Sequence, residues 1–483
     1  MGLGARRRGR GGRDQDAEID RGRDARRHGA HRHDENRRDR QNDPGGRDLK
    51  MTETTGQEDN WRNTILAGLA NYIDAGSIVA GSAALALWQE SYHLSNDFVG
   101  LIAAFGPNAI GAGVGALIGG WLCDKLGRKK IYQWDMLIYA LGMSMLVFAV
   151  APWMIVVGFL IVGLAVGADI PASWSLIAEQ APDNKRGKHS GVAQALWYLG
   201  PVVVLLMSLA LTSLGVLGAR IVFAHLVVIA LGLTLLRSKM KESERWVEAQ
   251  KSEVKRPPVS SLFKGKYLAS ILGLVGMYGF WNLWAGTNGF FFPYILRTMG
   301  AATQAQSVAI QAVSFFVAMI SVTFIFMRLS DKVNQRTLFI VSAVIQVAGM
   351  MLLAVFPLTI PVALLYVFLL QFGGGFGAQS FFQLWSSEMF PTMLRSTAQG
   401  VCFAIVRISL GVFSFFVPML NATGFTNLAW ILTGFLVISG IIGALWAPRN
   451  EGKSLEQLEA EQADPGRTQK EAQVACTPRN ANA

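Results

Sequence analysis

The sequence predicts an all-α membrane protein with twelve transmembrane helices in two six-helix bundles. Of its 483 residues, 51% are hydrophobic and 16% are charged, against roughly 25% charged in a typical soluble chain. Apolar runs succeed one another from Trp61 to residue 447, each long enough to cross an apolar core of ~30 Å as a helix. Two charged motifs also recur in the second half of the chain, which indicates an internal duplication.

The duplication rests on two unlike motifs that recur at nearly the same offset. The segment G-W-L-C-D-K-L-G-R-K-K at 120–130 has its counterpart in R-L-S-D-K-V-N-Q-R at 328–336. The spacing E-x-x-P-x-x-x-R occurs at 179–186 and again at 388–395. Both offsets correspond to a repeated unit of about 200 residues.

The predicted spans alternate with loops of unequal charge. Lys and Arg gather in one set of loops, and the alternate loops carry only Arg220 and Arg297. Because short basic loops resist translocation, this asymmetry predicts that both termini are cytoplasmic. We expect the spans at 63–88, 98–121, 131–150, 153–178, 189–213, 220–237, 267–293, 306–327, 337–356, 361–386, 397–420 and 427–447.

These spans define the expected domains. The Gly/Arg/Asp-rich tail has too few aliphatic residues to form a core, so we expect disorder there. This tail is either a lipid- or RNA-binding arm or sequence outside the native protein, which would then start at Met51. The expected units are a basic tail at 1–60, a first bundle at 61–237, a cytoplasmic linker with a short amphipathic helix at 238–266, a second bundle at 267–447 and a cytoplasmic tail at 448–483.

The motifs resemble those of the major facilitator superfamily, and within it the sugar porter branch with its inositol and polyol relatives. Residues 120–130 match the superfamily signature G-x-L-x-D-x-x-G-R-[RK]. E-S-E-R-W-V at 242–247 resembles the branch motif P-E-S-P-R-W-L, and P-R-N-E-G-K-S-L-E at 448–456 resembles P-E-T-K-G-x-S-L-E. The resemblance covers residues 61 to 460. It implies two bundles that rock about a central midplane site, so that access alternates between the two membrane faces.

The resemblance also implies a gate made of charged residues at the cytoplasmic ends of both bundles. The alternative interpretation is that these charges only set the topology. Carboxylates contribute little to topology, which favours a gate. The residues concerned are Asp124, Arg128, Glu179, Arg186, Asp331, Glu388 and Arg395.

Two carboxylates inside spans are candidates for proton coupling, because a charge within a span is costly and usually functional. Asp74 lies in Y-I-D-A-G-S-I, which resembles the element that carries the proton in proton-coupled sugar porters. In that family an arginine on span 4 pairs with this aspartate, but Phe159 stands at its position here. Span 4 has its own carboxylate, Asp169. Either Asp169 shares the proton role with Asp74, or the coupling differs from that of the family.

Arg407, halfway along span 11, is another conspicuous charge within a predicted span. It either pairs with one of the two aspartates or binds an anionic substrate, since guanidinium groups suit carboxylates. The first alternative gives a carrier of neutral polyols, and the second a carrier of organic acids.

A polyol site needs amides for the hydroxyls and aromatic rings for the apolar faces of the solute. Gln194 and Asn288 match amide positions of the sugar porters, and Asn282 stands where the family has a glutamine. On span 10, Gln383 replaces a tryptophan of the family, which puts an ordinary pyranose substrate in doubt. The candidate substrate residues are Gln194, Trp281, Asn282, Trp284, Asn288, Gln379, Gln383 and Arg407.

The sequence therefore predicts a secondary active transporter, a proton-coupled importer of a sugar or an inositol-like polyol. The alternatives are an organic-acid symporter that uses Arg407 and a non-transporting sensor. No nucleotide-binding, metalloprotease or hydrolase motif occurs, so we expect no enzyme activity, cofactor or metal. The expected partners are the solute, protons and the bilayer of the plasma membrane, with no nucleic acid, and we expect a monomer.

Overall fold

A computed structural model describes residues 61–238, 240, 242–251, 258–448, 453, 455, 457 and 458. These residues all belong to one compact unit, Gly56–Ala483. The predicted disordered tail at 1–60 and most of the predicted tail at 448–483 lie outside the described residues. Within the described part of the chain, every regular element is a helix.

The first group of helices covers the first half of the described chain. It is followed by α8 (Glu244–Lys251), which confirms a short helix in the predicted linker, and by η2 (Val259–Phe263). The helices of the group are α1 (Trp61–Tyr92), α2 (Asn96–Ala104), α3 (Ile110–Leu126), α4 (Arg128–Val147), α5 (Pro152–Gln180), α6 (Arg186–Ala210), η1 (Thr212–Leu214) and α7 (Val216–Arg237).

The second group contains a π-helical turn, η3, in the middle of one predicted span. Its elements are α9 (Gly265–Thr298), α10 (Gln304–Ser321), η3 (Val322–Phe326), α11 (Met327–Leu329), α12 (Gln335–Val355), α13 (Ile360–Gly375), α14 (Ala378–Glu388), α15 (Arg395–Thr423) and α16 (Phe425–Trp446). Each of the predicted spans coincides with one of these helices or with two or three consecutive elements.

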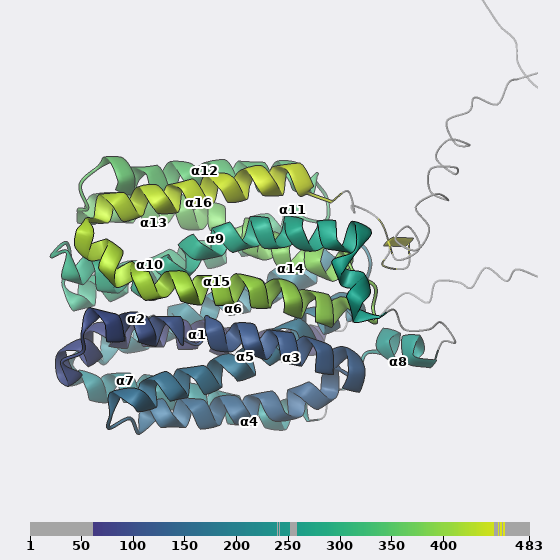
Figure 1. Cartoon of the computed structure of the whole chain (residues 1–483), viewed down its shortest axis with the longest axis horizontal. Helices are drawn as coiled ribbons and strands as arrows, with labels where there is room; N and C mark the ends of the chain where they lie inside the picture. Colours follow the sequence, from purple (N-terminus) through teal and green to yellow (C-terminus); the bar gives the residue numbers. More distant parts are fainter. Residues whose placement is uncertain are drawn as a thin grey trace, which may run out of the picture. The chain divides into compact units, whose positions relative to one another are not determined.

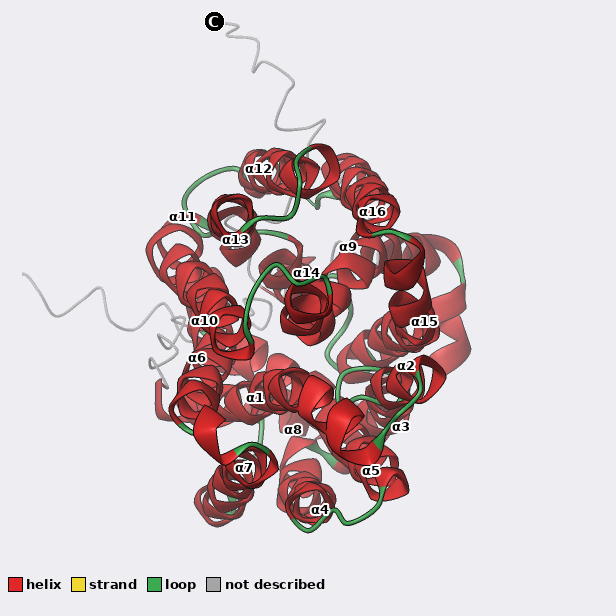
Figure 2. Ribbon diagram, turned by 90° about the vertical axis from the view of Figure 1, so that its left-hand side faces the viewer, coloured by secondary structure: helices red, strands yellow, loops and turns green. Residues whose placement is uncertain are grey.

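By length and composition, nine helical segments in the described residues are sufficient to cross a membrane. The remaining predicted spans coincide with α1, with the α2–α3 pair and with α4. Figure 1 shows the helices lying alongside one another, with α9–α16 in the upper half and α1–α7 in the lower half. Seen end-on, α14 lies near the centre, while α12 and α16 lie at the top and α4 and α7 at the bottom (Figure 2).

Two predicted spans are broken near their middle. The turn at 105–109, which contains Pro107, separates α2 from α3, and Phe376–Gly377 separates α13 from α14. Proline disfavours a continuous helix because it lacks a backbone donor and clashes with the preceding turn. Irregular backbone at membrane depth is tolerated where protein buries it or where it lines a cavity. Both breaks are next to the central cavity described below.

The two groups approach most closely where α3 crosses α15. A Cβ atom added at Gly400 would lie 2.2 Å from the carbonyl oxygen of Ala116, and one added at Gly120 would lie 2.3 Å from the carbonyl oxygen of Ser396. These are backbone atoms, so neither position has room for any side chain in this arrangement. Small residues permit such close helix contact in a membrane.

Candidate functional site

A small cavity lies between the two groups of helices, with a volume of about 40 Å³. This is room for a few water molecules, so a six-carbon solute requires the cavity to widen. Six of the predicted substrate residues line it, namely Trp281, Asn282, Trp284, Asn288, Gln379 and Arg407.

Tyrosine hydroxyls hold the amides of this lining. The hydroxyl of Tyr366 donates to Asn288 Oδ1 at 2.8 Å, and that of Tyr278 donates to Gln379 Oε1 at 2.7 Å. Trp284 Nε1 in turn donates to the Tyr366 hydroxyl at 3.3 Å. The amides are therefore fixed before a ligand arrives, which lowers the entropic cost of binding.

Arg407 on α15 has neutral partners in the cavity. Its Nη1 donates to Asn282 Oδ1 at 2.8 Å, and its Nη2 donates to the Tyr278 hydroxyl at 3.1 Å. Its guanidinium carbon lies 4.3 Å from the ring centre of Phe403. Neither Asp74 nor Asp169 forms an ion pair with this guanidinium among the contacts of the described residues. The cavity therefore contains a cation that is held by polar and aromatic groups.

Asp74 on α1 reaches the cavity through a neighbour. Its Oδ2 accepts a hydrogen bond from Trp197 Nε1 at 3.1 Å, and Trp197 lines the cavity. Its Oδ1 is buried and has no hydrogen-bond partner. Arg407 attracts the carboxylate electrostatically from across the site. A buried carboxylate with one oxygen unoccupied is suited to binding and releasing a proton.

Two predicted substrate residues contact each other instead of lining the cavity. Gln194 on α6 donates a hydrogen bond to Gln383 on α14, which joins the two groups of helices. The remaining amide atoms, Gln194 Oε1 and Gln383 Nε2, are buried without a partner. Separation of α6 from α14 would release Gln194 Nε2 and Gln383 Oε1, so that all four amide atoms could make other contacts.

Asp169 and Asp74 have different partners: Trp197 donates a hydrogen bond to Asp74, whereas Asp169 contacts Arg237. It forms an ion pair at 2.6 Å with Arg237, which also lies 3.6 Å from Asp135. The sequence pattern does not indicate Asp135 or Arg237 as site residues, because both lie near the ends of predicted spans, where charges are usually solvated. The cavity lining also includes residues that the sequence analysis missed: Asn108, Trp197, Tyr198 and Gln371. Asn108 and Gln371 lie within apolar runs, so their position in the sequence could have indicated a polar site inside the bundles.

The predicted gate residues are brought together at one end of the bundles, which we call the charged end. Glu179 Oε1 accepts from Arg128 Nη2 at 2.7 Å and from Arg395 Nη1 at 3.1 Å. All three side chains are fully buried. Arg186 Nε donates to Glu388 Oε1 at 2.9 Å, also between the groups. A carboxylate thus bridges one arginine from each half of the chain.

Each half also caps a helix of the other half with an aspartate. Asp124 Oδ2 accepts from Thr397 N at 2.7 Å, at the start of α15. Asp331 accepts from Gly187 N at 2.8 Å and from Lys188 N at 2.9 Å, at the start of α6. Carboxylates are favourable there because the first N–H groups of a helix have no partner within the helix and the dipole is positive.

The linker motif belongs to the same end. Glu242 accepts hydrogen bonds from Arg128 N at 3.0 Å and from Lys129 N at 3.1 Å, so it caps the start of α4. Arg186 Nη2 donates to the carbonyl oxygen of Lys453 at 2.7 Å. The segments that follow both halves of the chain therefore contact the predicted gate residues at the charged end.

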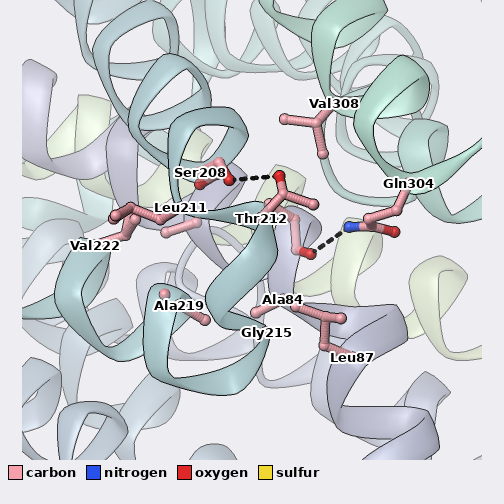
Figure 3. Close-up of a pocket in the computed structure, with 13 residues that line it drawn as sticks. Ala84, Leu87, Ser208, Leu211, Thr212, Gly215, Ala219, Val222, Gln304 and Val308 are labelled. Atoms are coloured by element: carbon pink, nitrogen blue, oxygen red, sulfur yellow. Dashed lines mark hydrogen bonds between the residues drawn. The ribbon is translucent and has the colours of Figure 1, made fainter.

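The opposite end of the cavity is closed by a second set of contacts. Arg297 on α9 forms an ion pair with Glu90 on α1, and its Nη1 donates to Gln304 Oε1 at 3.1 Å. Gln304 Nε2 donates to the carbonyl oxygen of Ala83 at 3.0 Å. Figure 3 shows Gln304 pointing from α10 toward α1, beside a pocket whose other wall includes Ser208 and Thr212. Contacts between the groups therefore close both ends of the cavity.

The fold and its motifs have close counterparts among known proteins. The family model of the Major Facilitator Superfamily matches residues 64–401 and 285–479. The chain belongs to the major facilitator superfamily. It is 45% identical over 421 residues to the minor myo-inositol transporter IolF of Bacillus subtilis, a match that covers 85% of this chain and 96% of the relative. It is 24% identical to the glucose transporter GlcP of Staphylococcus epidermidis, over 82% of this chain and 95% of the relative.

The solved structure of the proton:xylose symporter XylE bound to 6-bromo-6-deoxy-D-glucose has the same fold. It superposes with a TM-score of 0.70 at 19% identity and covers 83% of this chain and 98% of the other. This likeness confirms the predicted fold of the superfamily. The chain is a membrane transport protein of that superfamily and not an enzyme, as the sequence analysis predicted. The predicted domain boundaries stay a prediction.

Proposed function

We propose that this protein is a secondary active transporter that imports an inositol-like polyol together with protons by alternating access. The proposal rests on the cavity lining. It combines fixed neutral amides with the indoles of Trp281 and Trp284, and its cation, Arg407, is already hydrogen-bonded to Asn282 and Tyr278. Amides suit the hydroxyls of a polyol, and indole faces suit its C–H faces. The 45% identity to a myo-inositol transporter supports the same class of solute.

The proposed cycle alternates between opening of the charged end and of the opposite end. The charged end faces the cytoplasm, and both termini lie on that side of the plasma membrane, as the positive loops predict. Asp74 carries the coupled proton, since its Oδ1 is buried and unpartnered and its Oδ2 contacts the cavity through Trp197. Solute and proton bind from outside, and both leave after the ion pairs at the charged end separate.

The test is uptake by proteoliposomes with an imposed inward proton gradient. The panel contains labelled myo-inositol, hexoses, pentitols and small carboxylates. We expect gradient-driven accumulation of a neutral polyol. Accumulation of a carboxylate alone would overturn the proposal.

A proton-coupled carrier of organic acids is the second candidate, and Arg407 favours it. When Asp74 is ionised, its charge and that of Arg407 sum to zero, but protonation of Asp74 leaves the cavity positive. An anionic solute would restore neutrality in that state. Arg407→Gln retains a donor for Asn282 and removes the charge. It should spare transport of a neutral polyol and abolish transport of a carboxylate.

A further inference from the structure

Three charged side chains meet inside the first group of helices, away from the cavity. They are Asp135 on α4, Asp169 on α5 and Arg237 at the end of α7, with exposed fractions of 3%, 2% and 0%. Arg237 Nη1 lies 2.6 Å from Asp169 Oδ1 and 3.6 Å from Asp135 Oδ2. The rest of the guanidinium is engaged as well, since Nε donates to the carbonyl oxygen of Leu66 at 3.0 Å and Nη2 to that of Ala67 at 2.9 Å.

The ionised cluster would hold one negative charge too many. Two carboxylates face a single guanidinium, and the other titratable groups that act on the cluster supply no second cation. Tyr132 on α4 and Cys123 on α3 are neutral in their ordinary forms, and Asp74 on α1 is itself acidic. A buried uncompensated charge strongly destabilises the folded protein. A proton on one of the carboxylates removes that destabilisation.

The hydrogen bonds indicate where this proton lies. Asp135 Oδ1 accepts from its neighbour Met136 N at 2.6 Å, but the buried Oδ2 has no donor. Asp135 Oδ2 and Asp169 Oδ1 lie 3.6 Å and 2.6 Å from the same guanidinium nitrogen, Arg237 Nη1. Asp169 already accepts from Arg237 at Oδ1 and from Ser173 Oγ at Oδ2, at 3.0 Å. Two ionised carboxylates beside one guanidinium nitrogen repel each other, whereas one proton bound by the pair removes that repulsion.

We propose that Asp135 and Asp169 together bind one proton, at a site separate from Asp74. Arg237 neutralises the remaining charge and holds Asp169 in place. Helix α5 links this site to the gate, because it carries both Asp169 and Glu179. Between them, Ser175 Oγ contacts Ser396 Oγ of α15 at 2.9 Å. The proposal requires no assumption about the transported solute.

The test is infrared spectroscopy of the full-length protein in lipid nanodiscs at neutral pH, with carboxyl-labelled ¹³C-aspartate to identify aspartic acid bands. We expect a C=O stretching band of a protonated aspartic acid that disappears in Asp135→Asn and in Asp169→Asn. The band should remain in Asp74→Asn and in Asp97→Asn, which alters an exposed aspartate of α2. A folded Asp135→Asn protein with an unchanged spectrum in this region would overturn the proposal.

A second variant keeps the test decisive if Asp135→Asn does not fold. The double variant Asp135→Glu/Asp169→Glu retains both carboxyls at the site, so the band should respond to labelled glutamate in place of labelled aspartate. A band that still responds only to aspartate labelling, with the same intensity, would also count against a proton on the Asp135–Asp169 pair. Because neither readout involves transport, failure here and failure of the proposed solute are distinguishable.

Discussion

At the scale of single residues, we predict that transport coupled to the proton gradient depends on Asp74. Asn keeps the size of the side chain and a carbonyl acceptor for Trp197, but it cannot exchange a proton at pH values near neutral. We expect Asp74→Asn to abolish gradient-driven accumulation and to leave solute exchange across the membrane. Both are measured in the same proteoliposomes, and Asp97→Asn serves as the control. Accumulation at the level of the unaltered protein would exclude Asp74 as the proton carrier.

A second prediction at this scale concerns Glu179 and the stability of the closed charged end. It is the shared acceptor of Arg128 and Arg395, so Glu179→Gln leaves two buried guanidinium groups beside a neutral amide. Removing one partner from a buried ion pair typically costs about 3–5 kcal/mol. The closed charged end should be destabilised by an amount of that order.

Opening of the charged end can be measured by the reaction of buried thiols with a water-soluble reagent. Cys123 and Cys402 are free and buried, so in a Cys476→Ser background a water-soluble maleimide should react faster with the Glu179→Gln protein. Glu248→Gln, on the exposed face of α8, is the matched control. Equal labelling rates for the two variants would contradict a gating role of Glu179.

At the scale of elements, the crossing of α3 and α15 determines whether the charged end can close. Alanine at Gly400 would place a methyl group 2.2 Å from the carbonyl oxygen of Ala116, so the helices must separate. We expect Gly400→Ala to increase thiol labelling and to slow transport. Gly434→Ala on α16 is the control, because no atom lies within 4 Å of its new methyl group. Equal labelling rates in Gly400→Ala and Gly434→Ala would show that separation of α3 from α15 does not open the charged end.

The breaks within helices show what sequence patterns reveal at this scale and what they do not. Hydrophobic length predicted the spans, because a bilayer requires about 20 apolar residues in each. It did not predict that α13 ends before Phe376 or that η3 is π-helical, since those details depend on packing between helices. The contacts of Arg237 with Asp135 and Asp169 were missed because Asp135 and Arg237 lie near the ends of predicted spans, where charges are usually solvated. The predicted gate residues were singled out because their spacing repeats in both halves, and their role as a gate stays a prediction.

At the scale of the whole molecule, contacts between the two groups of helices lie at both ends of the cavity. In the proposed cycle these two sets of contacts break alternately. Glu90→Gln removes the ion pair with Arg297 at the end opposite the gate. We expect this variant to favour opening of that end and to reduce thiol labelling at the charged end. The measurement is the labelling rate of Cys123 in the Cys476→Ser background. Faster labelling would contradict the expected opposition of the two ends.

The reciprocal capping of α15 by Asp124 and of α6 by Asp331 has a consequence for the history of the chain. Here each copy supplies the residue that completes a helix of the other. A change to either aspartate removes a cap from a helix of the opposite half. We therefore expect the two loops to change together in evolution.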